Sequence, residues 1–182
     1  MLLAEFRKSD ALVTLRLPDD DRFQHVGAVI EQALQADDSK ALRTASAQFL
    51  ATAAKFYGVP APEIRVLAAR PIRVWESGAG HTELFGDYDT ETAMIRVWRR
   101  TAVQKRTTSY GTFLSTLCHE FCHHLDFKQY GFHDSPHTRG FYERAAVLYH
   151  HSRGTPVKKL FWVPTPGERW RIDWVQIRHG SV

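Results

Sequence analysis

The sequence predicts an α+β fold in which helices come first, a small, mostly antiparallel sheet follows, and two further helices complete the chain's core. Apolar residues recur at helical spacing from Val26 to Leu34 and from Leu42 to Phe56. Shorter segments of extended character follow, from Glu63 to Ala69 and from Ile72 to Trp75, bounded by proline and glycine. Helical periodicity returns after residue 109, so strands and helices are segregated along the chain as in α+β proteins.

The 182 residues suit one domain with a sizeable core, and no repeat or low-complexity segment divides them. We therefore expect a single domain over residues 1–182 with four consecutive parts. These are a helical scaffold in residues 1–60, the sheet in 61–101, a pair of helices that bear the functional residues in 109–152, and a basic, aromatic tail in 153–182.

The scaffold helices and the sheet have recognisable boundaries. The acidic run Asp19–Asp21 precedes the first helix, and Asp37–Ser39 closes it and caps the second. Gly58–Pro60 ends the second helix, because glycine readily adopts the left-handed conformation of a C-cap and proline cannot continue a helix. In the sheet we expect a hairpin with arms near Glu83–Phe85 and Met94–Thr101.

The most informative segment is His119–His123, which has the pattern H-E-x-x-H within a helix expected to begin near Ser109 and end at Gly131. At about 100° per residue, the two histidines lie about 40° apart, one turn from each other, so both imidazoles can reach one metal ion. Glu120 lies about 60° from the second histidine, where its carboxylate can act on water beside the metal without ligating it. The pattern predicts metal-assisted hydrolysis, with zinc as the metal, the two histidines as ligands and Glu120 as the general base.

The opposite side of this helix is apolar. Leu114, Cys118, Phe121 and Leu125 gather there, which predicts that the helix is anchored in a core and presents its motif outward. Cys118 and Cys122 are the only cysteines, so a disulfide framework is excluded and buried thiols are the expected state.

A catalytic zinc site usually has three protein ligands, and the candidates for the third are His133, His137 and Glu143. Ser135 and Pro136 are typical of the cap and first position of a second helix, which places His137 in its first turn. We favour His137, because the stripe that should pack on the first helix continues from it and Glu143 lies about 120° away, with Glu143 and His133 as alternatives. The stripe comprises Phe141, Arg144, Ala145 and Leu148.

Two positions after the motif exclude the metzincin pattern H-E-x-x-H-x-x-G-x-x-H, because Asp126 and Gln129 occupy its glycine and its third histidine. Asp126 lies on the metal-facing side, where we expect either an acceptor for a ligand imidazole or a solvated charge. Hydrolysis also needs a donor to an oxyanion, and spacing does not choose among the nearby candidates. These candidates are Tyr130, Arg139, Tyr142 and Tyr149.

The motif, the 13 residues that separate it from His137, and Phe141 four residues further on resemble the SprT-like zinc metalloproteases. The segment Gly86–Val97 is similar to the G-x-Y hairpin that precedes the active helix in that family. The resemblance covers about residues 60–150 and implies a zincin-like domain, Zn²⁺ at His119, His123 and His137, and a protein or peptide substrate. Two features depart from the family: Thr138 replaces a glycine after His137, and no C-terminal zinc ribbon is present.

The same resemblance makes Met94–Trp98 the candidate edge strand for an extended peptide, since a free edge offers main-chain hydrogen bonds. The alternative is an ordinary edge strand protected by Arg96, Arg99 and Arg100.

The net charge of +4 is too small to indicate a nucleic-acid partner. Residues 153–182, however, hold six basic residues against two acidic ones, interleaved with aromatic side chains that could stack on single-stranded nucleic acid. A tail that packs its rings on the body is the preferred interpretation. The aromatic residues are Phe161, Trp162, Trp170 and Trp174.

Glu5 and Arg7 come too early for the apolar region of a signal peptide, and no apolar run is long enough to span a membrane, so we expect a cytoplasmic protein without a membrane partner. The leading functional hypothesis is a zinc-dependent peptidase. The alternative is a non-catalytic, zinc-stabilised module that binds nucleic acid or protein through its tail. A closed site with four protein ligands would favour the alternative, and an open fourth position beside Glu120 would favour the enzyme.

Overall fold

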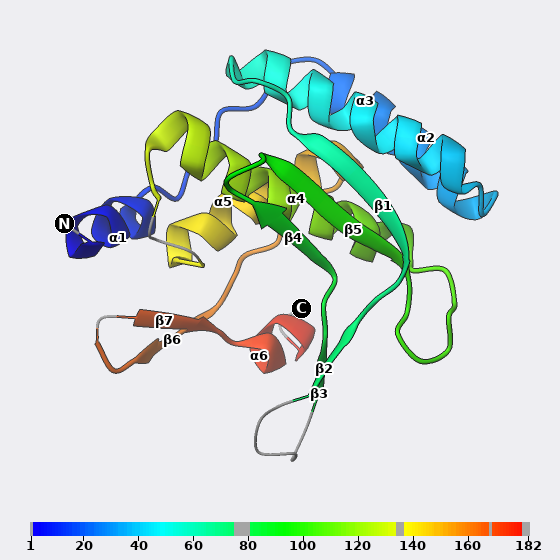
Figure 1. Ribbon diagram of the computed structural model, residues 1–182. Helices are drawn as coiled ribbons and strands as arrows, with labels where there is room; N and C mark the ends of the chain where they lie inside the picture. Colours follow the sequence, from blue (N-terminus) through cyan, green and yellow to red (C-terminus); the bar gives the residue numbers. More distant parts are fainter. Residues whose placement is uncertain (1, 75–80, 134–136, 168, 180–182) are drawn as a thin grey trace.

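The computed structural model describes residues 2–74, 81–133, 137–167 and 169–179, and it has the α+β architecture expected from the sequence (Figure 1). The elements in chain order are α1 (Leu2–Ala11), α2 (Arg22–Gln35), α3 (Ser39–Tyr57), β1 (Glu63–Ala69), β2 (Ile72–Val74), β3 (His81–Glu83), β4 (Gly86–Asp89), β5 (Met94–Arg100), α4 (Tyr110–Leu125), a π-helical turn (Asp126–Tyr130), α5 (Arg139–Arg153), β6 (Trp162–Thr165), β7 (Arg169–Ile172) and α6 (Trp174–His179). In this described part of the chain, every helix is too short or too polar to cross a membrane.

The ends of the scaffold helices follow from their capping residues. Asp38 accepts hydrogen bonds from the backbone nitrogens of Lys40 (2.9 Å) and Ala41 (3.0 Å), which satisfies two donors that lack helical partners. Gly58 ends α3 at φ 72°, in the left-handed region that glycine enters without steric cost. Both boundaries were predicted, whereas the pattern analysis did not single out α1.

The main sheet has the strand order β1-β5-β4. The central strand β5 is parallel to β1 and antiparallel to β4. It is therefore a small mixed sheet, and its parallel pair was not foreseen. The first arm of the hairpin is Gly86–Asp89 rather than Glu83–Phe85, because Glu83 belongs to β3 and pairs with Ile72. The turn after Asp89 sets this register: its carboxylate accepts from the nitrogens of Glu91 (3.0 Å) and Thr92 (3.1 Å).

The prediction that Met94–Trp98 forms an edge is wrong, because β5 is the central strand and pairs on both sides. Among the described residues, the edge strand next to α4 is β4, which pairs with β5 on one side only. The arginines expected to protect an edge have other partners. Arg96 pairs with Asp87 across the hairpin (2.7 Å).

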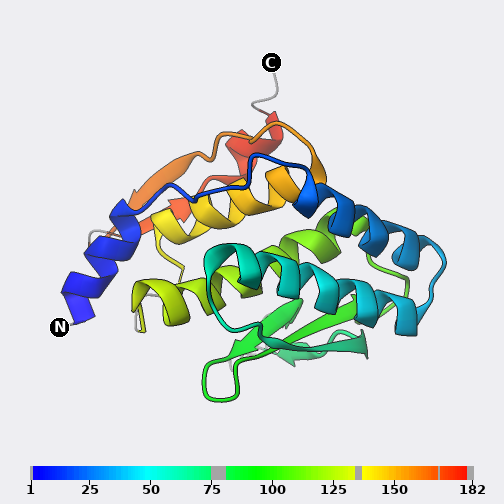
Figure 2. The ribbon, with the colours of Figure 1, turned by 90° about the horizontal axis from the view of Figure 1, so that it is seen from above.

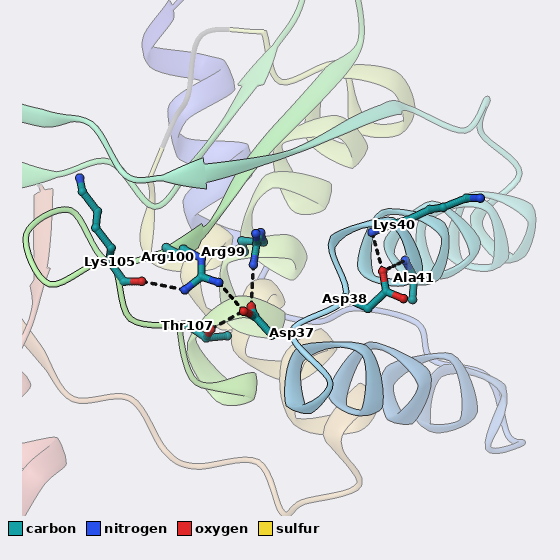
Figure 3. Close-up of polar contacts among 8 residues, drawn as sticks. All are labelled: Asp37, Asp38, Lys40, Ala41, Arg99, Arg100, Lys105 and Thr107. Carbon is teal, nitrogen blue, oxygen red and sulfur yellow. Dashed lines mark hydrogen bonds and ion pairs between the residues drawn. The ribbon is translucent and has the colours of Figure 1, made fainter.

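Arg99 and Arg100 instead bind Asp37 in the turn between α2 and α3, together with the Thr107 hydroxyl (Figure 3). Asp37 has a positive φ of 50°, which carries its side chain toward the end of β5. These contacts connect the helical scaffold to the loop that leads into α4.

The elements are stacked in layers, with the sheet on one side, α3 and α4 beside it, and α5 with the C-terminal tail beyond them (Figure 2). Ile95 and Val97 on β5 are fully buried. They belong to one continuous core with Leu114, Leu117 and Phe121 of α4. This packing positions α4 between the sheet and α5, so residues from all three can meet at its exposed side.

Candidate metal centre

Helix α4 carries the H-E-x-x-H segment and is fixed at both ends. The Ser109 hydroxyl accepts from the backbone nitrogen of Thr112 at the start (3.2 Å), and the π-helical turn ends at Gly131 with φ 67°. Leu114, Cys118 and Phe121 are fully buried, as predicted for the apolar side. The opposite side is therefore held outward by core packing.

The side-chain nitrogens of His119, His123 and His137 converge on one point. Their Nε2 atoms are separated by 3.0 Å (His119 to His137), 3.2 Å (His119 to His123) and 3.2 Å (His123 to His137). Ligands placed tetrahedrally about 2.0–2.1 Å from a zinc ion lie about 3.3 Å apart, so the observed triangle is close to the size that a divalent metal needs. This three-histidine group can hold a metal ion.

Partial burial of His119 and His123 favours the neutral imidazole, which can donate a lone pair, whereas His137 is more exposed. Desolvation, with a further effect of His137, lowers the pKa of His119 to about 4. Desolvation and the two neighbouring histidines lower that of His123 to about 2, and desolvation also lowers the pKa of His137. Neutral histidine is the form that binds metal, so the chemistry of the donor set fits the geometry.

Aromatic rings hold the imidazoles in place. Phe141 is fully buried, stacks on His123 at 4.3 Å and meets His119 edge-on at 4.8 Å. Tyr142 stacks on His137 with ring centres 5.6 Å apart and planes at 20°. Both rings come from the first turn of α5, which explains why the spacing from His137 to Phe141 is informative.

Glu120 follows the first histidine and is only 5 % exposed. Its carboxylate lies against Gly86 of β4: a methyl group on that glycine would stand 2.9 Å from Glu120 Oε1 and 2.6 Å from Thr116 Cγ2. Burial, and secondarily the charge of Asp87, raises the pKa of Glu120 to about 8. The carboxyl group therefore binds a proton more tightly than an exposed glutamate does.

The three histidines and Glu120 line a cavity of about 440 Å³. One wall is β4 and its flanks, and the other contains Asp126, Phe127, Phe132, His133 and His137. The remaining lining residues are Leu84, Gly86, Asp87, Tyr88, Thr90, Asp126, Phe127, Phe132 and His133.

The sequence suggested that His137 lies in the first turn of a helix. In the structure, it lies before the helix begins. Helix α5 begins at Arg139, with Thr138 as its cap accepting from the backbone nitrogen of Phe141 (3.1 Å), and His137 precedes that cap with φ 58°. Residues Ser135 and Pro136, the predicted start, lie outside the described residues. The two alternative candidates for the third ligand have other contacts. Glu143 accepts a hydrogen bond from Trp162 Nε1 (2.8 Å), and His133 packs on Phe127.

Asp126 is neither a partner of a ligand imidazole nor a solvated charge, which corrects the sequence-based expectation. It is 4 % exposed and accepts two hydrogen bonds from Arg144, at 2.7 and 2.8 Å. The cause is that α5 turns Arg144 inward, where its charge needs a buried partner.

Among the four candidate oxyanion donors, Tyr142 alone has a ring in contact with the triad in the described structure. Arg139 pairs with Asp10, and Tyr149 accepts from Arg153.

A further functional contact, between α4 and β4, was missed by pattern analysis. His124 is fully buried, donates through Nε2 to the Pro60 carbonyl (2.8 Å) and accepts from the Tyr88 hydroxyl (3.0 Å). It ties β4 to the helix of the motif. A glycine inside a strand, Gly86, was the available signal, since it indicates close approach of another segment.

No protein-family model, curated protein or solved structure matched the chain in the comparisons. The function is therefore inferred from the chemistry of the site itself.

Proposed function

We propose that the protein is a zinc-dependent peptidase. The observation that carries the proposal is the meeting of three Nε2 atoms, each 3.0 to 3.2 Å from the others, beside the buried carboxylate of Glu120. A zinc ion, when bound there, supplies a Lewis acid that polarises a carbonyl oxygen and makes water more acidic.

The chain's own residues then have separate roles in the proposal. His119, His123 and His137 hold the metal, and Glu120 accepts a proton from water and returns it to the leaving amine. Tyr142 is the candidate donor to the oxyanion, since its ring stacks on His137.

The free edge of β4 supports a peptide as the substrate. Trp98 donates its backbone N–H to the Phe85 carbonyl, so in the antiparallel ladder Phe85 and every second residue after it direct their N–H and C=O groups toward β5. The N–H and C=O groups of Gly86 and Tyr88 consequently point toward the open edge. An extended peptide that pairs with these two residues would pass over the cavity that contains the triad.

Ligand number supports an enzyme over a zinc-stabilised binding module. Within the described residues, no fourth histidine, cysteine or carboxylate joins the triad, whereas a structural zinc normally has four protein ligands. Asp134 lies outside that description. In the tail, Trp162 is hydrogen-bonded to Glu143, and Trp170 packs on Arg139 at 5.2 Å. Trp162 is thereby engaged with α5 and less available for stacking on nucleic acid, whereas Trp170 remains 38 % exposed.

The SprT-like resemblance supports the same proposal through the spacing of the motif and through the G-x-Y hairpin, whose Tyr88 contacts His124 of α4 in this chain. We propose membership of that family on these grounds alone, because the comparisons contain no match.

The test combines metal analysis with a peptide library. The zinc-loaded protein is incubated with mixed peptides and new termini are identified by mass spectrometry, alongside the variants Glu120→Gln and Glu143→Gln. Glu120→Gln should keep the metal and lose about 10²–10⁴-fold in cleavage rate, whereas Glu143→Gln, a matched control on α5, should retain both. Cleavage by Glu120→Gln at the wild-type rate would refute the mechanism.

A further inference from the structure

The C-terminal end of α1 lies directly against the start of α5 (Figure 2). The approach is so close that a methyl group on Gly140 would stand 2.1 Å from the Ser9 carbonyl oxygen and 2.6 Å from that of Leu12. Only glycine at this position allows the two backbones to meet. A helix that merely covered the surface would not require such close contact between backbones.

Polar contacts join α1 to the two residues that follow His137. The Ser9 hydroxyl is hydrogen-bonded to the Thr138 hydroxyl at 2.8 Å, and the two side chains are 0 % and 2 % exposed. Asp10 accepts from the backbone nitrogen of Arg139 at 2.9 Å and pairs with its guanidinium group. The cap of α5 is therefore itself held by α1.

Arg144 extends this connection to the helix of the H-E-x-x-H motif. It is 1 % exposed, donates to the carbonyls of Ser9 and Leu12, and pairs with Asp126 immediately after α4. One buried guanidinium thus links α1, α5 and the end of α4. Helices α4 and α5 precede and follow His137 in the chain, and α1 packs against α5.

His137 itself has φ 58°, a left-handed conformation that is uncommon for a residue other than glycine or asparagine. Such a conformation persists only where the surroundings determine it. On the C-terminal side of His137, the contacts of Ser9 with Thr138 and of Asp10 with Arg139 fix the backbone.

We infer that α1 is a positioning element of the metal centre: Ser9 and Asp10 hold Thr138 and Arg139 so that His137 completes the three-nitrogen site. The inference rests on the metal-binding part of the proposed function. Without α1 the site retains the two histidines of α4, and metal affinity falls by about 10- to 100-fold, the usual effect of losing groups that orient a ligand. Coupling is reciprocal, so bound metal must also tighten α1 onto α5.

The test measures zinc affinity by competition with a chromophoric chelator in the variant Ser9→Ala/Asp10→Ala. The control is Lys8→Ala, at an exposed position on the same helix. We expect a 10- to 100-fold loss in the double variant and none in the control. In a His137→Ala background the same double substitution should have no further effect, because its action passes through that ligand.

Wild-type affinity in a folded Ser9→Ala/Asp10→Ala variant, together with a loss in His137→Ala, would refute the role of α1 and leave the metal centre intact. Equal zinc binding by the wild type and His119→Ala would instead refute the metal centre, and this inference with it. If the double variant fails to fold, hydrogen exchange of the wild type decides: amides of α1 should gain protection on adding zinc, and unchanged protection would overturn the inference.

Discussion

Replacing Gly86 by alanine would place a methyl group of β4 against α4 at the point where Glu120 is held. The new Cβ would lie 2.6 Å from Thr116 Cγ2, 2.9 Å from Glu120 Oε1 and 3.0 Å from Glu120 Cγ. Carbon atoms in ordinary contact are about 3.5–4.0 Å apart, so strand and helix must separate by about 1 Å. Overpacking of this kind costs about 1–3 kcal/mol in the free energy of unfolding.

The effect on cleavage should exceed the effect on stability, since a displacement of about 1 Å at a catalytic group can reduce the rate about 10²-fold. A second substitution separates the two effects. In Gly86→Ala/Thr116→Ser the closest carbon is removed while the hydroxyl keeps its bond to the Thr112 carbonyl (2.9 Å). Stability should partly return, but cleavage should stay low because the contacts with Glu120 remain.

The assays are urea unfolding and cleavage of a peptide from the library. Gly111→Ala is the matched control on α4, because the atoms nearest to its methyl group would be the ends of the flexible Arg153 and Tyr149 side chains, at 3.2 Å. Wild-type stability and cleavage in Gly86→Ala would show that β4 does not pack on α4 at Glu120 as described.

The remaining predictions concern other residues. Arg144→Met leaves the Asp126 carboxylate buried without a partner and should lower the free energy of unfolding by about 3–5 kcal/mol, so an unchanged urea midpoint would contradict the network. Tyr142→Phe keeps the ring on His137 but removes the hydroxyl; zinc affinity should stay constant while cleavage falls by about 10²-fold, and equal cleavage would exclude Tyr142 as the oxyanion donor. Burial, followed by nearby positive charge, lowers the pKa of His150 below its ordinary 6.5, so its contribution to stability is present above pH 6.5 and is lost as the pH falls toward the folded pKa. His150→Asn should therefore flatten the loss of stability as the pH falls below 6.5, as measured by urea unfolding, and an unchanged slope would contradict this assignment.

Features that depend on local chemistry were predictable from the sequence. The cap at Asp38, the end of α3 at Gly58 and the apolar side of α4 each follow from a few neighbouring residues. The meeting of His137 with the motif was also anticipated, because Phe141, four residues after His137, must pack on α4 and brings the start of α5 close to the motif.

Features decided by distant segments were not predictable. Serine and threonine are both suitable helix caps, so the sequence does not choose between Ser135 and Thr138. The cap in the structure, Thr138, is hydrogen-bonded to Ser9, which lies 129 positions earlier in the chain. The edge strand was misassigned because β5 also pairs with β1, and parallel pairing leaves little local trace in a sequence. The partner of Asp126 was not predictable either, because the sequence does not show that the Arg144 side chain points into the interior, where it binds Asp126.

The central claim is that His119, His123 and His137 bind one zinc ion, and X-ray absorption at the zinc edge tests it most directly. The zinc-loaded protein should show three imidazole ligands about 2.0–2.1 Å from the metal, His137→Ala should show two, and Glu143→Gln should match the wild type. An unchanged imidazole count in His137→Ala, with an altered spectrum in Glu143→Gln, would contradict the account.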